Sequence, residues 1–111
     1  MTRICVDPMM ATPRTPTWRY DAGCHLFCLH GDLDALRAFA RLLGLHRSFL
    51  HPAPGFPHFD LTAAMRAKAV AGGAEEVTTR TPEFRAYLKA RPARVAAEKA
   101  ALDPNPPFEA R

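Results

Sequence analysis

Residues 24–44, C-H-L-F-C-L-H-G-D-L-D-A-L-R-A-F-A-R-L-L-G, decide the fold of this chain of 111 amino acids. The first six form a short apolar run that Gly31 soon ends, which is typical of a buried strand. Asp32 is then a candidate helix N-cap and Gly44 a candidate stop. Between them, apolar residues recur at helical spacing, at positions 33, 36, 39, 40 and 43. A buried strand followed by an amphipathic helix predicts an α/β domain.

The alternation of strand and helix continues on both sides of this segment. Strands are predicted at residues 3–7, 24–29, 58–61 and 75–78, with a further short strand at 47–50. Helices are predicted over 33–43, through Ala71 after an N-cap at Thr62, from Pro82 after an N-cap at Thr81, and over 93–102. Residues 8–23 and 45–57 are predicted loops.

This alternation predicts one α/β domain over residues 1–102. We expect a small, mostly parallel sheet of three to four strands, covered by three to four helices. Residues 103–111 are predicted to form a flexible tail.

The composition excludes several classes of protein. The chain has 15 basic and 11 acidic residues, a net charge of +4, which favours anionic partners only slightly. Its three cysteines show no disulfide spacing, so reduced thiols are expected. The first residues lack the apolar run of a signal peptide, and no segment approaches the roughly 20 apolar residues of a membrane span. We therefore expect a cytoplasmic protein that does not enter a membrane.

Two cysteines and two histidines, Cys24, His25, Cys28 and His30, lie close together and resemble a zinc cluster. On a strand, Cys24 and Cys28 share a face but lie roughly 13 Å apart, too far for one ion. On a helix they would meet at i, i+4, but the short run between glycines favours a strand. We interpret the cysteines as buried thiols packed like small apolar groups.

A second set of polar residues, Asp7, His25, His58 and Asp60, is a stronger candidate site. Asp7 ends the first predicted strand, and Asp60 precedes a predicted helix. In a strand, His58 and Asp60 project to one side while Phe59 turns to the core. Such carboxylates and imidazoles bind a divalent ion (Mg, Mn or Zn) or act as general acid and base, and we predict Asp7, His58 and Asp60 as metal ligands.

A structural interpretation of the same four residues remains open. Asp60 or Thr62 would then cap the helix, His58 would be a hydrogen-bonded loop histidine, and Asp7 would bond backbone amides in the next turn.

Four further residues are candidates for binding the substrate. Arg47 and Arg66 flank the predicted site and suit an anion. Trp18 and Arg19 lie in the long loop, where an aromatic ring beside a cation can close over a ligand and stack on a base. Trp18 can equally anchor the loop on the core. The basic residues of the C-terminal half fit a solvated helix face better than a phosphate site, because acidic residues dilute them.

Several ordered motifs resemble the bacterial and phage domain-of-unknown-function family 4031. They are V-D at 6–7, C-H-L at 24–26, L-x-x-L-x-A-F-A-R-L-L-G-L at 33–45, H-F-D-L-T at 58–62 and G-G-A-E-E-V-T-T-R at 72–80. The resemblance covers about residues 3–90 and implies positions, not a mechanism. The matching polar positions are Asp7, His25, His58 and Asp60, whereas Cys28 and His30 lie outside the pattern.

Two functions are compatible with the sequence. The first is a small enzyme that hydrolyses a phosphoester, nucleotide or nucleic acid with the help of a divalent metal held by Asp7, His58 and Asp60. The second is a non-catalytic accessory module that binds a partner through its proline-rich loops and basic helical face.

Overall fold

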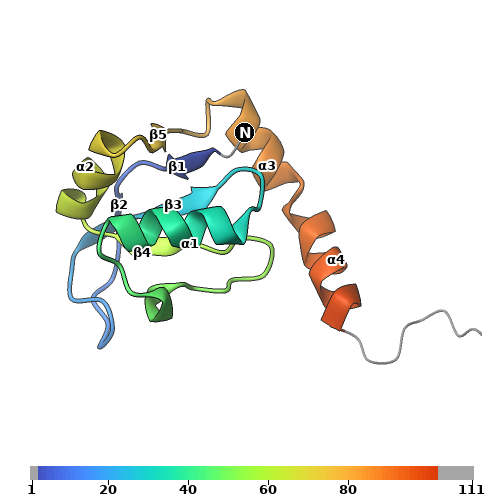
Figure 1. Cartoon of the computed structure of the whole chain (residues 1–111), viewed down its shortest axis with the longest axis horizontal. Helices are drawn as coiled ribbons and strands as arrows, with labels where there is room; N and C mark the ends of the chain where they lie inside the picture. Colours follow the sequence, from blue (N-terminus) through green and yellow to red (C-terminus); the bar gives the residue numbers. More distant parts are fainter. Residues whose placement is uncertain (1–2, 103–111) are drawn as a thin grey trace, which may run out of the picture.

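A mixed sheet built around one central strand forms the middle of the molecule (Figure 1). The computed structural model describes residues 3–102; the predicted tail, 103–111, lies outside the described residues. The strands are β1 (Ile4–Val6), β2 (Met10–Ala11), β3 (Ala22–Cys28), β4 (Phe59–Leu61) and β5 (Glu75–Glu76). β3 pairs antiparallel with β1 and β2 along one edge and with β4 along the other, and β5 pairs parallel with β1.

The predicted α/β class is confirmed, but the prediction of a mostly parallel sheet is wrong. Among the strand pairings within residues 3–102, only that of β1 with β5 is parallel. After β3 the chain forms α1 and then the long segment 43–58. This segment leads into β4, which runs antiparallel to β3. The carboxyl ends of β1 and β4 therefore lie beside the amino end of β3. His30 and Asp32, which follow β3, lie at the opposite end of the sheet.

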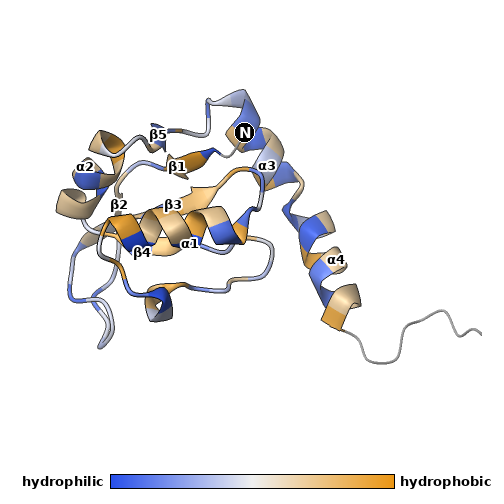
Figure 2. Cartoon of the chain, viewed as in Figure 1, coloured by the Kyte–Doolittle hydropathy of each residue, from blue (hydrophilic) through white to orange (hydrophobic). Residues whose placement is uncertain are grey.

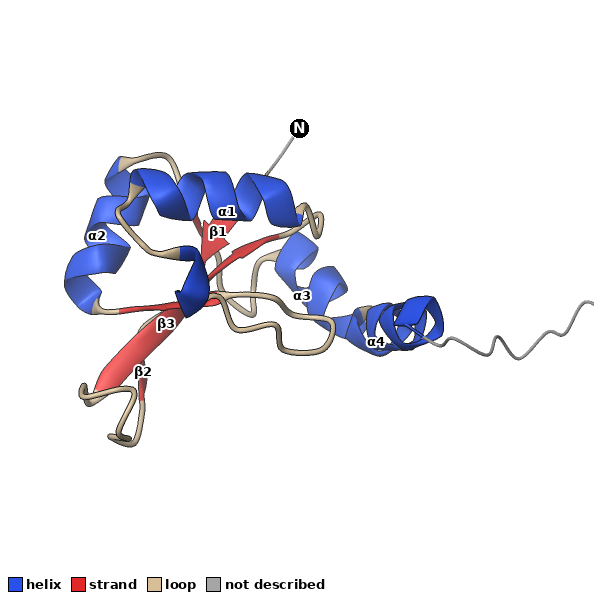
Figure 3. Cartoon of the chain, turned by 60° about the horizontal axis from the view of Figure 1, so that its bottom comes forward, coloured by secondary structure: helices blue, strands red, loops and turns tan. Residues whose placement is uncertain are grey.

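The long N-terminal loop is an ordered hairpin arm over much of its length. β2 pairs with the start of β3, and an isolated bridge joins Thr15 to Trp18 near the tip. Arg14 and Asp21 form an ion pair across the arm at 2.7 Å. The arm projects beyond the sheet in Figure 3.

The predicted short strand at 47–50 is wrong, because residues Arg47–Phe49 form a 3₁₀ helix, η1. The Nδ1 atom of His46 accepts the backbone N–H of Ser48 at 3.1 Å, which satisfies one of the donors exposed at the start of the turn. This local bond favours a turn over an extended segment.

The first two helices begin at the predicted caps. α1 (Leu33–Leu42) starts after Asp32, whose carboxylate accepts a backbone N–H of the first turn at 3.1 Å. α2 (Ala63–Ala71) starts after Thr62, whose hydroxyl accepts an N–H at 3.2 Å. Both predictions are confirmed, because a side-chain oxygen at the N-cap replaces a missing intrahelical acceptor.

Two further helices follow β5. α3 (Pro82–Lys89) has proline in its first turn, as predicted, but the Thr81 hydroxyl accepts from Thr78 N–H and does not cap the helix. α4 (Arg91–Leu102) extends away from the sheet (Figure 1). Among the residues described, no helix combines the length and the apolar character that crossing a membrane requires.

The two faces of the sheet carry two separate cores. α1 and α2 cover one face (Figure 3), where Cys24, Leu26 and Cys28 of β3 pack. α3 covers part of the other face, where Phe27 contacts the rings of Phe56, Phe84 and Tyr87. This division follows from the alternation of side chains along β3, which sends Leu26 to one core and Phe27 to the other. Figure 2 shows the hydrophobic colouring of β3 in the middle of the sheet.

Truncating Phe27 is expected to destabilise the domain strongly. Phe27 is 0% exposed, and Phe27→Ala leaves a cavity among three aromatic rings, at a cost of about 3–5 kcal/mol. Leu42, on α1, is 83% exposed, and Leu42→Ala is expected to change the free energy of unfolding by less than about 0.5 kcal/mol. Urea denaturation of both variants measures the difference, and equal effects would contradict the two-core packing.

Candidate metal centre

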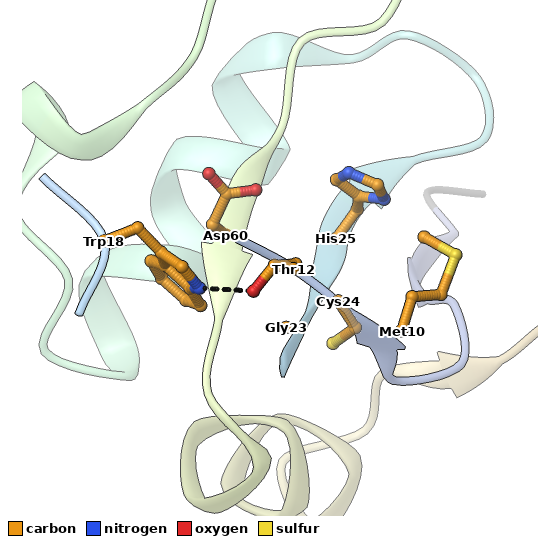
Figure 4. Close-up of a pocket in the computed structure, with 7 residues that line it drawn as sticks. All are labelled: Met10, Thr12, Trp18, Gly23, Cys24, His25 and Asp60. Carbon is orange, nitrogen blue, oxygen red and sulfur yellow. Dashed lines mark hydrogen bonds between the residues drawn. The ribbon is translucent and has the colours of Figure 1, made fainter. Parts of the chain in front are cut away.

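The candidate site lies on the sheet face that carries Phe27, beside the start of β3. His25 of β3 and Asp60 of β4 are directly paired across the two strands. Their backbone neighbours Cys24, Leu26 and Phe59 point to the opposite core, so His25 and Asp60 share one face. Figure 4 shows the imidazole of His25 and the carboxylate of Asp60 rising on the same side of their strands.

Asp7 fixes the position of His25 through two hydrogen bonds. The backbone N–H of His25 donates to one carboxylate oxygen of Asp7 at 2.6 Å, and Nδ1 of His25 lies 2.6 Å from the other oxygen. Asp7 is 5% exposed, and both of its carboxylate oxygens have a hydrogen-bond partner in His25. The hydrogen bond to Asp7 raises the pKa of His25 above its ordinary value, although burial opposes the rise.

His58 is fixed by a backbone carbonyl. Its Nδ1 lies 2.8 Å from the carbonyl oxygen of Phe56, which can only accept, so Nδ1 carries the hydrogen. Burial lowers the pKa of His58, although the bond to Phe56 opposes this. The neutral ring therefore presents Nε2 without a hydrogen. The rings of His58 and His25 meet edge to face, with centroids 4.7 Å apart.

The side chains of His25, His58 and Asp60 converge. One ligand atom from each lies within 4.8 Å of the others, and His58 Nε2 is 3.5 Å from a carboxylate oxygen of Asp60. Two ligands about 2.0–2.1 Å from a zinc ion at a tetrahedral angle lie about 3.3 Å apart, close to this spacing. The Nδ1 atoms of both imidazoles are already engaged, so their Nε2 atoms are the ones left to face the carboxylate of Asp60. With both Nε2 atoms unprotonated, these three groups could hold a divalent cation.

His51 joins the site although the sequence analysis did not select it. Its Nε2 lies 2.9 Å from the second carboxylate oxygen of Asp60, and its ring stacks on His58 with centroids 5.3 Å apart. An antiparallel bridge between His51 and His58 closes the intervening loop and brings the two rings together. The available signal was the segment H-P-A-P-G-F-P-H, in which a histidine stands at each end of a proline-rich loop.

The structure places the remaining predicted site residues differently. Asp7 does not belong to the converging set, because both of its carboxylate oxygens contact His25. Arg66 donates to the backbone oxygen of Asp7 at 2.9 Å and to Glu76 at 3.0 Å, so it links α2 to β1 and β5. Arg47 lies in η1 and lines a pocket with Arg37 and Arg41, and the lining of this pocket does not include His25 or His58.

The two loop candidates lie on the hairpin arm. The indole N–H of Trp18 donates to the hydroxyl of Thr12 at 3.0 Å (Figure 4). Trp18 lines a small pocket of about 110 Å³ together with His25 and Asp60, so this ring borders the candidate centre. Arg19, next to it, is exposed.

The cysteines are packed in the core, as the strand geometry predicts. Cys5, Cys24 and Cys28 are free and buried, and none belongs to the converging set. Burial raises the pKa of Cys24 to about 11 and that of Cys5 to about 12, so these thiols are neutral near pH 7.

The contact between Asp7 and His25 predicts a pH-dependent contribution to stability. Because the folded-state pKa of His25 is raised, the stabilisation is fully present below about pH 6.5 and declines as the pH rises through the folded pKa. Asp7→Asn is expected to cost about 1–3 kcal/mol at about pH 6 and less at about pH 9. Chemical denaturation at both pH values, without metal, measures the difference.

Asp21→Asn is the matched control for this prediction. Asp21 also pairs with a cation, Arg14, but the pair is exposed and contains no histidine. Its effect is expected to be small and to be the same at both pH values. A cost of Asp7→Asn that does not change with pH would show that His25 does not titrate against Asp7.

A comparison with models of protein families gives a match over residues 4–90. They match the model of the family described as "Protein of unknown function (DUF4031)", and the matched range contains Asp7, His25, His58 and Asp60. Searches of curated proteins and of solved structures gave no significant match. Since the match covers most of the 111 residues, the chain belongs to the DUF4031 family.

Proposed function

We propose that this protein is a divalent-metal-assisted hydrolase of phosphoesters that acts on a nucleotide or nucleic acid. The observation that carries the proposal is the convergence of His25, His58 and Asp60, with the second nitrogen of each imidazole already hydrogen-bonded. In metal sites, such outer hydrogen bonds orient the rings and select the tautomer that binds the ion. The net charge of +4 favours an anionic substrate.

The ligand set favours some metals over others. Two imidazoles and one carboxylate suit zinc or manganese, whereas magnesium prefers an all-oxygen shell. Three protein ligands leave a coordination position open, as catalytic zinc sites do. A bound ion supplies Lewis-acid polarisation of a phosphoryl oxygen and a water of lowered pKa.

The residues around the three ligands have distinct tasks in this proposal. Asp7 orients His25 and increases its basicity. The carbonyl of Phe56 does the same for His58. His51, whose side chain is more than half exposed, contacts Asp60 from the solvent side and lies where a proton is exchanged with water.

Zinc binding tests the ligand set. The full chain is expected to bind one zinc ion by calorimetry, and His58→Ala is expected to weaken binding by more than about 100-fold, since losing an outer-shell partner alone costs about 10- to 100-fold. Affinity is expected to fall as the pH falls through the raised pKa of His25, because the proton and the metal compete for Nε2.

His46→Ala is the matched control for the zinc measurement. His46 is an exposed histidine that caps η1 and does not belong to the converging set, so its loss is expected to leave the affinity unchanged. Zinc binding that survives His58→Ala, or that is lost equally in His46→Ala, would end the proposal of a metal centre at His25, His58 and Asp60.

Hydrolysis of a chromogenic phosphodiester, bis(p-nitrophenyl) phosphate, tests the catalytic step. We expect a rate that depends on added manganese or zinc and that falls in Asp60→Asn to the rate seen without metal. His30→Ala, an exposed histidine at the opposite end of the sheet, is the control and should retain the wild-type rate. Hydrolysis that proceeds equally in Asp60→Asn would place the reaction elsewhere.

The second candidate function is a non-catalytic binding module. The exposed basic residues of α3, Arg85 and Lys89, favour it. The proline-rich loop favours it less, because Arg91 and Arg94 of α4 donate to the backbone oxygens of Pro54 and Gly55 and hold the loop against the protein. Nucleic-acid binding without zinc binding or hydrolysis would support this alternative.

A further inference from the structure

A groove with aromatic walls adjoins the candidate metal centre. It has a volume of about 710 Å³, within the range typical of ligand sites. Trp18 and Tyr20 of the hairpin arm line it together with Phe49 of η1, so aromatic rings come from two separate segments. Tyr20 is 52% and Phe49 60% exposed, so both rings are open to a ligand.

The groove reaches the metal centre through β4. Asp60 and His51 are among its lining residues, and Asp60 also belongs to the converging set of metal ligands. The other polar lining residues are the hydroxyl residues Thr17, Ser48 and Thr62. Among the residues that the structure describes, no lysine or arginine lines this groove, so it suits the uncharged part of a ligand: a flat ring with hydrogen-bonding groups at its edge.

A basic pocket of about 560 Å³ lies next to the groove. Arg37 and Arg41, one turn apart on α1, line it with Arg47 and His46, and no acidic residue is among its lining residues. Within residues 3–102, none of the three guanidinium groups takes part in a side-chain hydrogen bond or an ion pair with another residue. Leu45 lines both the pocket and the groove, so the two adjoin at this residue.

From this arrangement we infer that the substrate is a single-stranded nucleic acid. Bases stack in the aromatic groove, a neighbouring backbone phosphate binds the three arginines, and the phosphodiester to be cleaved lies at His25, His58 and Asp60. Aromatic rings beside a basic track are the usual elements of single-strand recognition. The single phosphate of a mononucleotide cannot occupy the arginine pocket and the candidate metal centre together, and a duplex could not insert its paired bases into the groove. The inference rests on the proposed function, since the metal centre defines where cleavage occurs.

Binding of labelled oligonucleotides tests the inference. Fluorescence anisotropy compares oligothymidylate and oligouridylate of about ten nucleotides with a duplex of the same length and with thymidine monophosphate. The single strands are expected to bind at least about 10-fold more tightly than the duplex or the monophosphate. Comparison of the DNA and RNA strands shows which sugar is preferred. EDTA is present throughout, so neither cleavage nor the metal contributes.

Two variants separate the groove from the basic pocket. Phe49→Ala removes one stacking surface and is expected to weaken binding about 5- to 100-fold. The triple variant Arg37→Ala, Arg41→Ala, Arg47→Ala is expected to reduce the salt dependence, with the slope of log affinity against log salt smaller by about 0.7, the value for one phosphate of a single strand. The control triple Arg80→Ala, Arg85→Ala, Lys89→Ala removes the same charge near α3 and should leave that slope unchanged.

Several results would overturn the inference. They are equal binding of duplex and single strand, an unchanged affinity in Phe49→Ala, a control triple that lowers the slope as much as the arginine-pocket triple, or no binding of any strand. Thermal melts confirm that the variants are folded, as their exposed positions lead us to expect. Strand binding is measured without zinc, so a negative result in that test does not affect the conclusion from zinc binding. In the same way, a protein that does not bind zinc can still bind the single strand.

Discussion

The two contacts between Asp7 and His25 connect the fold to the candidate site. One carboxylate oxygen accepts the backbone N–H of β3, and the other orients the imidazole of the same residue. Asp7 follows β1 directly, so the same side chain joins two strands and sets the tautomer of a candidate metal ligand. A buried carboxylate needs such partners, because burying its charge without them is costly. The position of the ring relative to Asp60 then follows from the pairing of β3 with β4.

The second half of the site depends on a loop that α4 supports. Phe56, which accepts the hydrogen bond from His58, lies in a loop whose backbone receives three contacts from α4. Arg91 donates to Pro54, Arg94 donates to Gly55, and Glu98 accepts the N–H of Gly55. Gly55 has a positive φ of 67°, and a Cβ there would lie 2.8 Å from Val95. α4 thus helps to position His58, although it follows the residues that match the family.

Local sequence signals predicted the elements well. The N-caps Asp32 and Thr62 and the buried alternation of β3 act within one turn or one strand, so the sequence contains all the information they require. The same holds for His58, Phe59 and Asp60, where a period of two places the polar pair on one face. His51 was missed because its role depends on a loop closure between residues that are seven positions apart. Arg66 was predicted to contact the substrate. Its partner in the structure is the backbone oxygen of Asp7, and a sequence pattern of side chains does not predict a bond to a distant backbone atom.

The sequence by itself determined which residues alternate along each strand, where α1 and α2 begin, and that the thiols of β3 and His25 lie on opposite faces. These properties follow from backbone periods and from hydrogen bonds between near neighbours. Only the tertiary structure decided that β4 runs antiparallel to β3, that Asp7 hydrogen-bonds the imidazole of His25, and that the imidazole of His51 contacts the carboxylate of Asp60. The direction and order of strands depend on pairing between distant segments and on the path of the loops that join them, which the periodicity of the sequence does not encode.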